Sequence, residues 1–234
     1  MRYGEADRIL HLYTEDQGRI GAIAKGVRRA KSRLGGRLEP ITRTNLLLRR
    51  GRGDLYTITG ADTVAPYRRL REHHAGLDMA GRACDAVGRL FAEGEPHPAV
   101  FHLLGNELAL LESDPGQATH ANQLAFRLKL LVAAGLAPQL GSCATCGEAD
   151  HLGAFSGAAG GVVCAACEAG AFGMDEEAHR FLTGVLAVPL AQAPGASERA
   201  LRQAERAINA TVEHHGGFQL RDAAPRRMAG ARRG

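Results

Sequence analysis

Two cysteine pairs constrain the fold of this chain more than any other feature of its sequence. Cys143 and Cys146 form the first CxxC pair, Cys164 and Cys167 form the second, and 17 residues separate the pairs. Each CxxC turn lets two thiolates converge on one ion, and this spacing is typical of a zinc ribbon with four cysteine ligands. Four thiolates complete a tetrahedron, so we expect one structural Zn²⁺ per chain without an open catalytic position. A redox dithiol pair and unbound cysteines are the alternatives.

The remaining cysteine and the chain start indicate the compartment. Cys84 falls on the apolar face of an expected helix and is interpreted as a buried small hydrophobe. Five cysteines with four in close pairs suit a metal site in a reducing compartment better than a disulfide framework. No window approaches the roughly 18 apolar residues of a membrane span, and the N-terminus lacks the apolar core of a secretory signal. We therefore expect a cytoplasmic protein.

Charge is distributed unevenly along the chain. Residues 1–70 carry 15 Lys and Arg against 7 Asp and Glu, whereas residues 71–234 carry 14 against 18. A net charge of +4 on the whole chain would ordinarily mean only a solvated surface. Its concentration in the first third favours a polyanionic partner instead, and nucleic acid is the obvious candidate.

The N-terminal third has the pattern of short strands. Apolar runs at residues 9–13, 20–24, 41–48 and 55–59 are separated by turn residues, with Gly51-Arg52-Gly53-Asp54 between the last two. This pattern predicts a small antiparallel β-barrel over residues 1–66. Only four strands are visible, and an oligonucleotide-binding (OB) barrel needs a fifth.

The period changes to helical from about residue 67. Apolar residues recur at three- and four-residue steps from Leu77 to Phe91 and from Val100 to Leu111, and residues 121–134 are apolar on nearly every side. Asp175 and Ser197 are expected to begin two later helices as N-caps. The sequence therefore predicts an α+β protein, with an all-α domain at 67–221 that carries the zinc module at 140–173. Residues 222–234 are expected to form a disordered basic tail.

A dense run of cations lies in the predicted barrel. Ten basic residues fall between positions 25 and 52, and Glu39 is the only acid among them. Glycines make the first part a loop that can follow a phosphate backbone, and few aromatic residues, Tyr13 and Tyr56, are near enough to stack on bases. We expect salt-sensitive binding with little sequence preference. The predicted DNA-binding residues are Lys25, Arg28, Arg29, Lys31, Arg33, Arg37, Arg49, Arg50 and Arg52.

The sequence fits two other classes of protein less well. An enzyme is disfavoured because the carboxylates are scattered and no Walker loop, HExxH or GxSxG motif occurs, so no catalytic residue is assigned. A zinc-ribbon transcription or translation factor would contact nucleic acid through the ribbon. Residues 140–173 contain no Lys or Arg but three acids, Glu148, Asp150 and Glu168. This ribbon should repel phosphate.

The motifs resemble those of the RecO family of bacterial recombination mediators. The resemblance runs in order over roughly residues 4–170. It rests on Gly4-Glu5-Ala6-Asp7-Arg8, Ala24 to Arg29, Lys31-Ser32-Arg33, Leu38-Glu39-Pro40, Arg49 to Arg52, Phe126-Arg127-Leu128, Gly135 to Pro138 and Cys143 to Gly147.

This resemblance implies an OB-fold followed by a helical domain with a zinc module. Family members bind single- and double-stranded DNA, anneal complementary strands, and act with RecR to help RecA load on coated DNA. The C-terminal tail of the single-stranded DNA-binding protein docks on their helical domain. Arg127 matches a basic position of the family's docking site for this tail. The alternative is that Arg127 is a structural charge paired with a neighbouring acid. The implied location is the cytoplasm, in association with the nucleoid.

The chain departs from the family at its N-terminus. Family members have an apolar strand before the Gly4-Glu5-Ala6-Asp7 motif, whereas this sequence reaches the motif almost at once. We therefore expect the barrel to lack its first strand. We also expect the true start of the protein to lie upstream of Met1.

Overall fold

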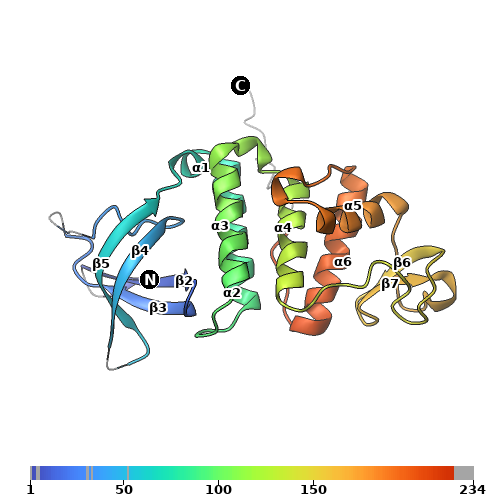
Figure 1. Cartoon of the computed structure of the whole chain (residues 1–234), viewed down its shortest axis with the longest axis horizontal. Helices are drawn as coiled ribbons and strands as arrows, with labels where there is room; N and C mark the ends of the chain where they lie inside the picture. Colours follow the sequence, from blue (N-terminus) through green and yellow to red (C-terminus); the bar gives the residue numbers. More distant parts are fainter. Residues whose placement is uncertain (1, 4–5, 30–31, 33, 52, 224–234) are drawn as a thin grey trace, which may run out of the picture.

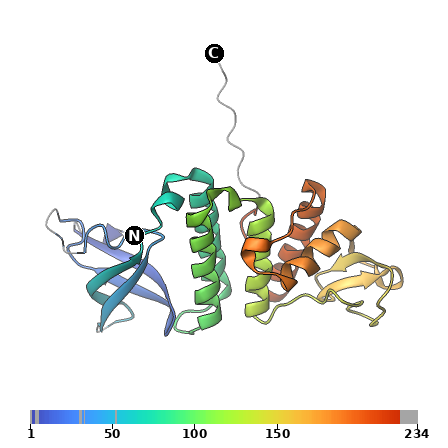
Figure 2. The ribbon, with the colours of Figure 1, turned by 45° about the horizontal axis from the view of Figure 1, so that its top comes forward.

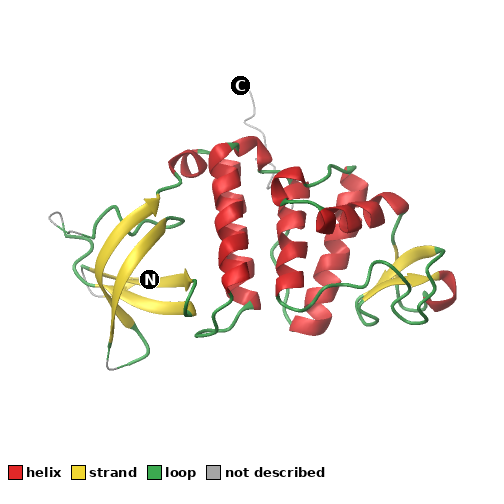
Figure 3. Ribbon diagram, viewed as in Figure 1, coloured by secondary structure: helices red, strands yellow, loops and turns green. Residues whose placement is uncertain are grey.

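The computed structural model describes residues 2–3, 6–29, 32, 34–51 and 53–223. Figure 1 shows an N-terminal sheet at one end, a small sheet at the other and helices between them. Figure 2 gives the same order from a second direction, and Figure 3 shows that the strands are confined to the two ends. The chain thus has the predicted α+β class.

In the described part of the N-terminal domain, five strands form one sheet in the order β1-β2-β3-β5-β4. Neighbouring strands are antiparallel except β3 and β5, which run parallel. Buried residues alternate along β3, and the interior is closed by Ile58 and Ala61 together with Val27 and Leu38 from the following loop. The strands are β1 (Arg2–Tyr3), β2 (Asp7–Thr14), β3 (Gly18–Ala24), β4 (Arg43–Arg50) and β5 (Tyr56–Ala65).

The expectation that the sheet lacks its first strand is wrong for this structure. β1 pairs with β2 through the register Arg2↔Arg8 and Tyr3↔Asp7. With two residues it is too short to give an alternating apolar pattern, which is why the sequence did not reveal it. The predicted OB-fold-like sheet is confirmed, and its strand pairs are antiparallel apart from the short parallel contact between β3 and β5.

Six α-helices follow among the described residues. Ser197 and Asp175 cap α6 and α5 as predicted, by accepting hydrogen bonds from the N–H groups of Ala200 (3.3 Å) and Ala178 (2.9 Å). Gly217 ends α6 with a φ of 70°. The helices are α1 (Arg68–Glu72), α2 (His74–Leu90), α3 (Pro98–Ser113), α4 (His120–Ala133), α5 (Glu176–Ala187) and α6 (Glu198–Gly216), with 3-10 turns η1 (Pro115–Gln117), η2 (Ala165–Cys167) and η3 (Leu190–Gln192).

Helix α4 lies at the centre of the helical core. Leu124, Phe126, Leu128 and Leu131 are completely buried, so the prediction of a buried helix is confirmed. Because residues on every side of α4 are covered, its polar residues must find partners inside the protein. Leu77, which the periodicity placed on the core face of α2, is instead 37% exposed.

The N-terminal sheet is attached to the helices by the β2–β3 turn. The Arg19 carbonyl accepts a hydrogen bond from the Gly94 N–H (3.0 Å), and the Arg19 guanidinium donates to the Gly88 carbonyl on α2. Gly18 has a φ of +62°, and a Cβ there would lie 1.9 Å from the Glu95 carbonyl oxygen. Glycine is required because the two backbones touch at this point.

Three short strands form the sheet that carries the cysteine pairs. The order is β7-β6-β8, with β6 at Leu152–Ser156, β7 at Gly161–Cys164 and β8 at Phe172–Gly173. These strands lie within the predicted zinc module at 140–173, and the rest of the domain is helical. Hydrogen bonds between Gln139 and the backbone of Gly160 and Val162 (2.9 Å each) anchor the module to the segment after α4. Among the described residues, none of the helices combines the length and apolar character needed to cross a membrane.

Candidate functional site

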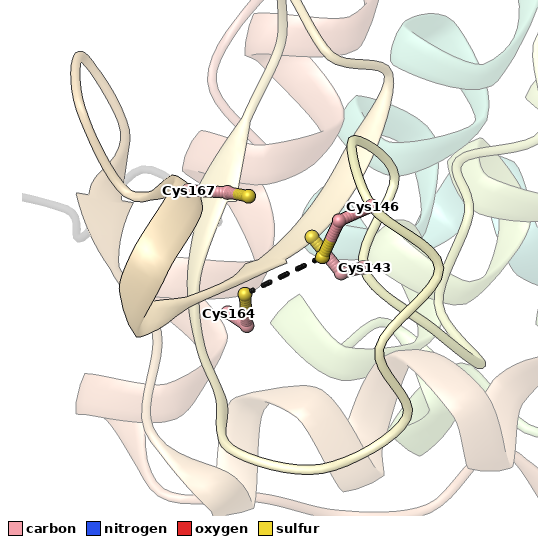
Figure 4. Close-up of side chains that lie close together, drawn as sticks. All are labelled: Cys143, Cys146, Cys164 and Cys167. Atoms are coloured by element: carbon pink, nitrogen blue, oxygen red, sulfur yellow. Dashed lines mark hydrogen bonds between the residues drawn. The ribbon is translucent and has the colours of Figure 1, made fainter.

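The four predicted cysteines converge at the outer end of the helical domain. Figure 4 shows Cys143 and Cys146 on the loop before β6, facing Cys164 at the end of β7 and Cys167 at the end of η2. The four Sγ atoms all lie within 4.8 Å of one another. Cys143 and Cys164 are buried, and Cys146 is exposed. The spacing in the sequence therefore predicted the cluster correctly.

Backbone hydrogen bonds hold the first cysteine turn in shape. The Cys143 N–H donates to the Glu148 carbonyl (2.7 Å), and the Gly147 N–H donates to the Cys143 carbonyl (2.9 Å). Gly147 has a φ of 80°, a conformation that side chains rarely allow. This closed turn brings both sulfurs to the same side of the loop.

The thiols of the cluster differ in acidity. Backbone N–H groups of Cys146 and Cys164 lower the pKa of Cys143 to about 6. Hydrogen bonding to Cys146 raises the pKa of Cys167 to about 12. A thiolate on Cys143 is therefore the natural first ligand of a cation.

The geometry fits a tetrahedral metal ion. Zinc–sulfur bonds of about 2.3 Å place neighbouring sulfurs about 3.8 Å apart in a tetrahedron. The Cys146 and Cys164 sulfurs are 3.7 Å apart. A disulfide would need about 2.05 Å, so this pair is not bonded. The cluster can hold one metal ion with four thiolates, and such a set leaves no ligand position for substrate.

Exposed cations gather on the loop between β3 and β4. Lys25, Arg28, Arg29 and Arg37 are all exposed on this loop. Val27 and Leu38 are buried at its two ends (8% and 6% exposed), so the loop is pinned to the sheet while its charged side chains face solvent. The predicted residues Lys31, Arg33 and Arg52 lie outside the described residues.

The strand register brings the end of β4 toward the same part of the sheet. Arg50 pairs with Tyr56, which pairs in turn with Ala22 near the end of β3. Arg49 and Arg50 are exposed and lie two strands from the start of the basic loop, roughly 10 Å across the sheet. We call the described cations of this region the basic surface: Lys25, Arg28, Arg29, Arg37, Arg49 and Arg50.

Two residues of the N-terminal domain are used structurally. Tyr13, expected to stack on bases, packs against the helical core with a buried hydroxyl, and burial raises its pKa to about 12. That expectation is wrong. Arg43, counted within the run of cations, lies over the Phe101 ring at 5.3 Å and supports the junction between the domains.

Arg127 lies deep inside the helical domain. Its side chain is 1% exposed and sits 3.7 Å from the Glu205 carboxylate (Nη1 to Oε1). Within the described residues, its Nε and Nη1 atoms have no hydrogen-bond acceptor. Burial lowers the pKa of Arg127 to about 10. The partner-binding role of Arg127 stays a prediction. Glu205 is the kind of neighbouring acid that the alternative, a structural charge pair, requires.

A segment that the sequence did not single out covers Arg127. Residues 218–223 follow α6, and the Arg221 and Asp222 carbonyls accept hydrogen bonds from Arg127 and Arg82. Asp222 and Ala223 were assigned to the disordered tail, yet Ala223 is only 2% exposed. The rest of that tail, 224–234, lies outside the described residues. No periodic pattern marks such an extended segment, so the sequence carries no signal for it.

An OB-fold-like sheet with a basic surface, joined to a helical domain with a four-cysteine cluster, defines the class of this two-part α+β protein. The family models described as Recombination protein O N terminal and Recombination protein O C terminal match residues 1–67 and 79–223. The chain belongs to the RecO family of DNA repair proteins.

Relatives named DNA repair protein RecO support this assignment. The protein from Rubrobacter xylanophilus is 39% identical over 241 residues, covering 99% of this chain and 94% of its own. The one from Anaeromyxobacter sp. strain K is 34% identical over 232 residues (93% and 88%), and that from a Nocardioides species is 37% identical over 227 (92% and 89%). The similarity thus extends over both domains.

Proposed function

We propose that this chain is a DNA repair and recombination mediator that acts without covalent chemistry. It binds single- and double-stranded DNA, anneals complementary strands, and assists RecA loading together with RecR. The observation that carries the proposal is the basic surface, whose six cations are exposed on a loop and a strand end of an OB-fold-like sheet. The proposed location is the cytoplasm, at the nucleoid.

The basic surface would act through charge. Its side chains face solvent, and five of the six make no ion pair among the described residues, so they are available to phosphate; Arg37 pairs with Asp62 (3.6 Å). Neutralising two approaching strands together lowers their mutual repulsion, which lets complementary bases meet. Because Tyr13 packs against the helical core with its hydroxyl buried, little base stacking is available, so binding is driven by the DNA backbone and depends weakly on sequence.

The metal of the cysteine cluster is proposed to be structural Zn²⁺. Cys143, Cys146, Cys164 and Cys167 would hold it, and the ion would fix the two loops of the module against each other. Glu148, Asp150 and Glu168 are exposed around the cluster, and residues 140–173 contain no cation. This surface repels phosphate, which disfavours a nucleic-acid-binding ribbon.

A protein contact would direct this activity to coated DNA. The C-terminal tail of the single-stranded DNA-binding protein is acidic and apolar, and Arg127 is a cation on an otherwise apolar helix of the core. Two guanidinium nitrogens without an acceptor among the described residues support a carboxylate ligand at this place. RecA would be reached indirectly, through RecR and the coated strand.

The test is DNA binding across a salt series with charge-reversed variants. Fluorescent single-stranded DNA is titrated with wild type, with Arg28→Glu/Arg29→Glu, and with the control Arg199→Glu/Arg202→Glu, whose residues are exposed on α6. Loss of two phosphate contacts should make the negative slope of log association constant against log salt concentration shallower by about 1.4. The control should bind like wild type. An unchanged slope in the loop variant would remove the basic surface from DNA binding.

A further inference from the structure

The last described residues of the chain pack onto the helical domain. Residues 218–223, here called the C-terminal strap, leave α6 at Gly217, where the left-handed backbone (φ 70°) turns the chain back. Leu220 and Ala223 are 7% and 2% exposed and belong to the helical core. The two residues between them are exposed, so the strap is an extended segment with two apolar anchors.

The strap lies across three helices. Arg82 and Arg89 of α2 donate to the carbonyls of Asp222 and Gln219, and Arg127 of α4 donates to that of Arg221. The Ala223 N–H donates to the Glu205 carboxylate on α6. We call the surface of α2, α4 and α6 that the strap covers the α2–α4–α6 groove. It binds the strap backbone through polar groups and the Leu220 and Ala223 side chains through apolar contacts.

The strap satisfies the buried cation in this groove incompletely. Arg127 receives a neutral carbonyl from the strap and a carboxylate at 3.7 Å, while its Nε and Nη1 lack an acceptor within the described residues. A buried guanidinium has five N–H donors and is stabilised most by a carboxylate that accepts two of them. The strap's carbonyl at Arg127 is that of Arg221, and the Asp222 carbonyl accepts from Arg82 instead.

We propose that the C-terminal strap is an intramolecular occupant of the α2–α4–α6 groove, displaced by an extended peptide that carries a carboxylate beside an apolar side chain. The inference rests on the proposed docking of an acidic, apolar protein tail. With the strap in place Arg127 is 1% exposed, so the peptide reaches it only after the strap leaves. Apparent affinity is then the intrinsic affinity multiplied by the fraction of molecules with a free groove.

The experiment weakens one anchor of the strap without adding charge. Leu220→Ser removes the apolar anchor, and Gln219→Ser is the matched control because Gln219 is exposed. The probe is a fluorescent synthetic peptide that corresponds to the C-terminal tail of the single-stranded DNA-binding protein, titrated against the full-length variants by anisotropy. Leu220→Ser should bind at least about fivefold more tightly than wild type, and Gln219→Ser should match wild type.

Hydrogen–deuterium exchange on the wild type gives a second readout that needs no strap variant. The Ala223 amide is protected by Glu205 in the free protein and should exchange faster once the peptide is bound. An Arg127→Met variant, close in volume, should lose peptide binding. Peptide binding to this variant therefore tests whether the peptide binds in the α2–α4–α6 groove.

The outcomes separate the two proposals. Peptide binding that requires Arg127 but is equal in wild type and Leu220→Ser, with unchanged protection at Ala223, overturns the strap and leaves the docking proposal standing. Absence of binding to every variant overturns both. If Leu220→Ser fails to fold, the exchange measured on wild type decides alone.

Discussion

Glu107 on α3 has the most perturbed carboxyl group among the described residues. It is 0% exposed, and its two oxygens share the Asn122 amide nitrogen at 3.2 and 3.3 Å. Burial raises the pKa of Glu107 from 4.5 to about 8, against the smaller opposing effect of the Asn122 hydrogen bonds. Glu107 is therefore neutral in the folded protein at pH 7.

The sign of the pH dependence follows from this shift. The unfolded chain releases the proton near pH 4.5, whereas the folded protein keeps it to about 8. Since the folded state binds more protons in this window, the contribution to stability is full below pH 4.5 and is lost as the pH rises toward 8. At 1.36 kcal/mol per unit, the loss between pH 5 and pH 8 is about 3 to 4 kcal/mol.

Glu107→Gln should remove this loss, because glutamine has nearly the same shape and does not ionise. The free energy of unfolding is measured by urea denaturation from pH 5 to pH 9 for wild type and variant, and the difference between them is followed. Between pH 5 and pH 8, the free energy of unfolding of the variant should rise relative to that of wild type by about 3 to 4 kcal/mol.

Glu213→Gln, at an exposed position of α6, is the control for loss of one negative charge. Its difference from wild type should stay nearly constant with pH. A constant difference for Glu107→Gln as well would mean that the Glu107 carboxyl is not held neutral by burial, and the reasoning would be refuted.

Three further predictions concern packing, metal and the junction between the domains. Leu131→Ala, at a fully buried position of α4, should lower the free energy of unfolding by about 2 to 5 kcal/mol, whereas Val132→Ala, 44% exposed, should change it by less than about 1 kcal/mol in the same urea titration. Cys164→Ser should abolish the metal found by mass spectrometry of the purified protein, and a variant that retains one ion per chain would contradict the four-thiolate site. Gly18→Ala should destabilise the protein by more than about 1 kcal/mol in thermal unfolding, because its Cβ would lie 1.9 Å from a backbone oxygen at a φ of +62°; Gly53→Ala, with nothing within 4 Å, should have little effect. Equal effects of the two alanines would contradict the close approach.

Local patterns were enough to predict much of the fold and the cysteine cluster. Helix α4 is apolar on nearly every side, and a helix of that kind has to be buried. Asp175 and Ser197 begin α5 and α6, because their side chains satisfy N–H groups of the first turn. The CxxC spacing identified all four sulfurs of the cluster, since metal geometry restricts such loops strongly.

Features set by distant parts of the chain could not be predicted. A two-residue strand such as β1 exists only because β2 offers it a backbone partner. The role of Tyr13 depended on where the helices meet the sheet, and neither periodicity nor charge reports that. The strap over Arg127 lacks a repeating pattern because its hydrogen bonds to Arg127 and Arg82 are made by backbone carbonyls, which every sequence has.

The narrow parallel contact between β3 and β5 has a consequence for how the N-terminal domain folds. The β2–β3 and β4–β5 hairpins are each formed by neighbouring segments of the chain. They are joined by the register pairs Ala22↔Tyr56 and Ile23↔Thr57, whose partners lie 34 residues apart in the sequence. The intervening segment carries most of the domain's cations, so loop closure must work against like-charge repulsion as well as chain entropy. We therefore expect formation of this seam to be the slow step of folding, and counter-ions that screen the loop should accelerate it.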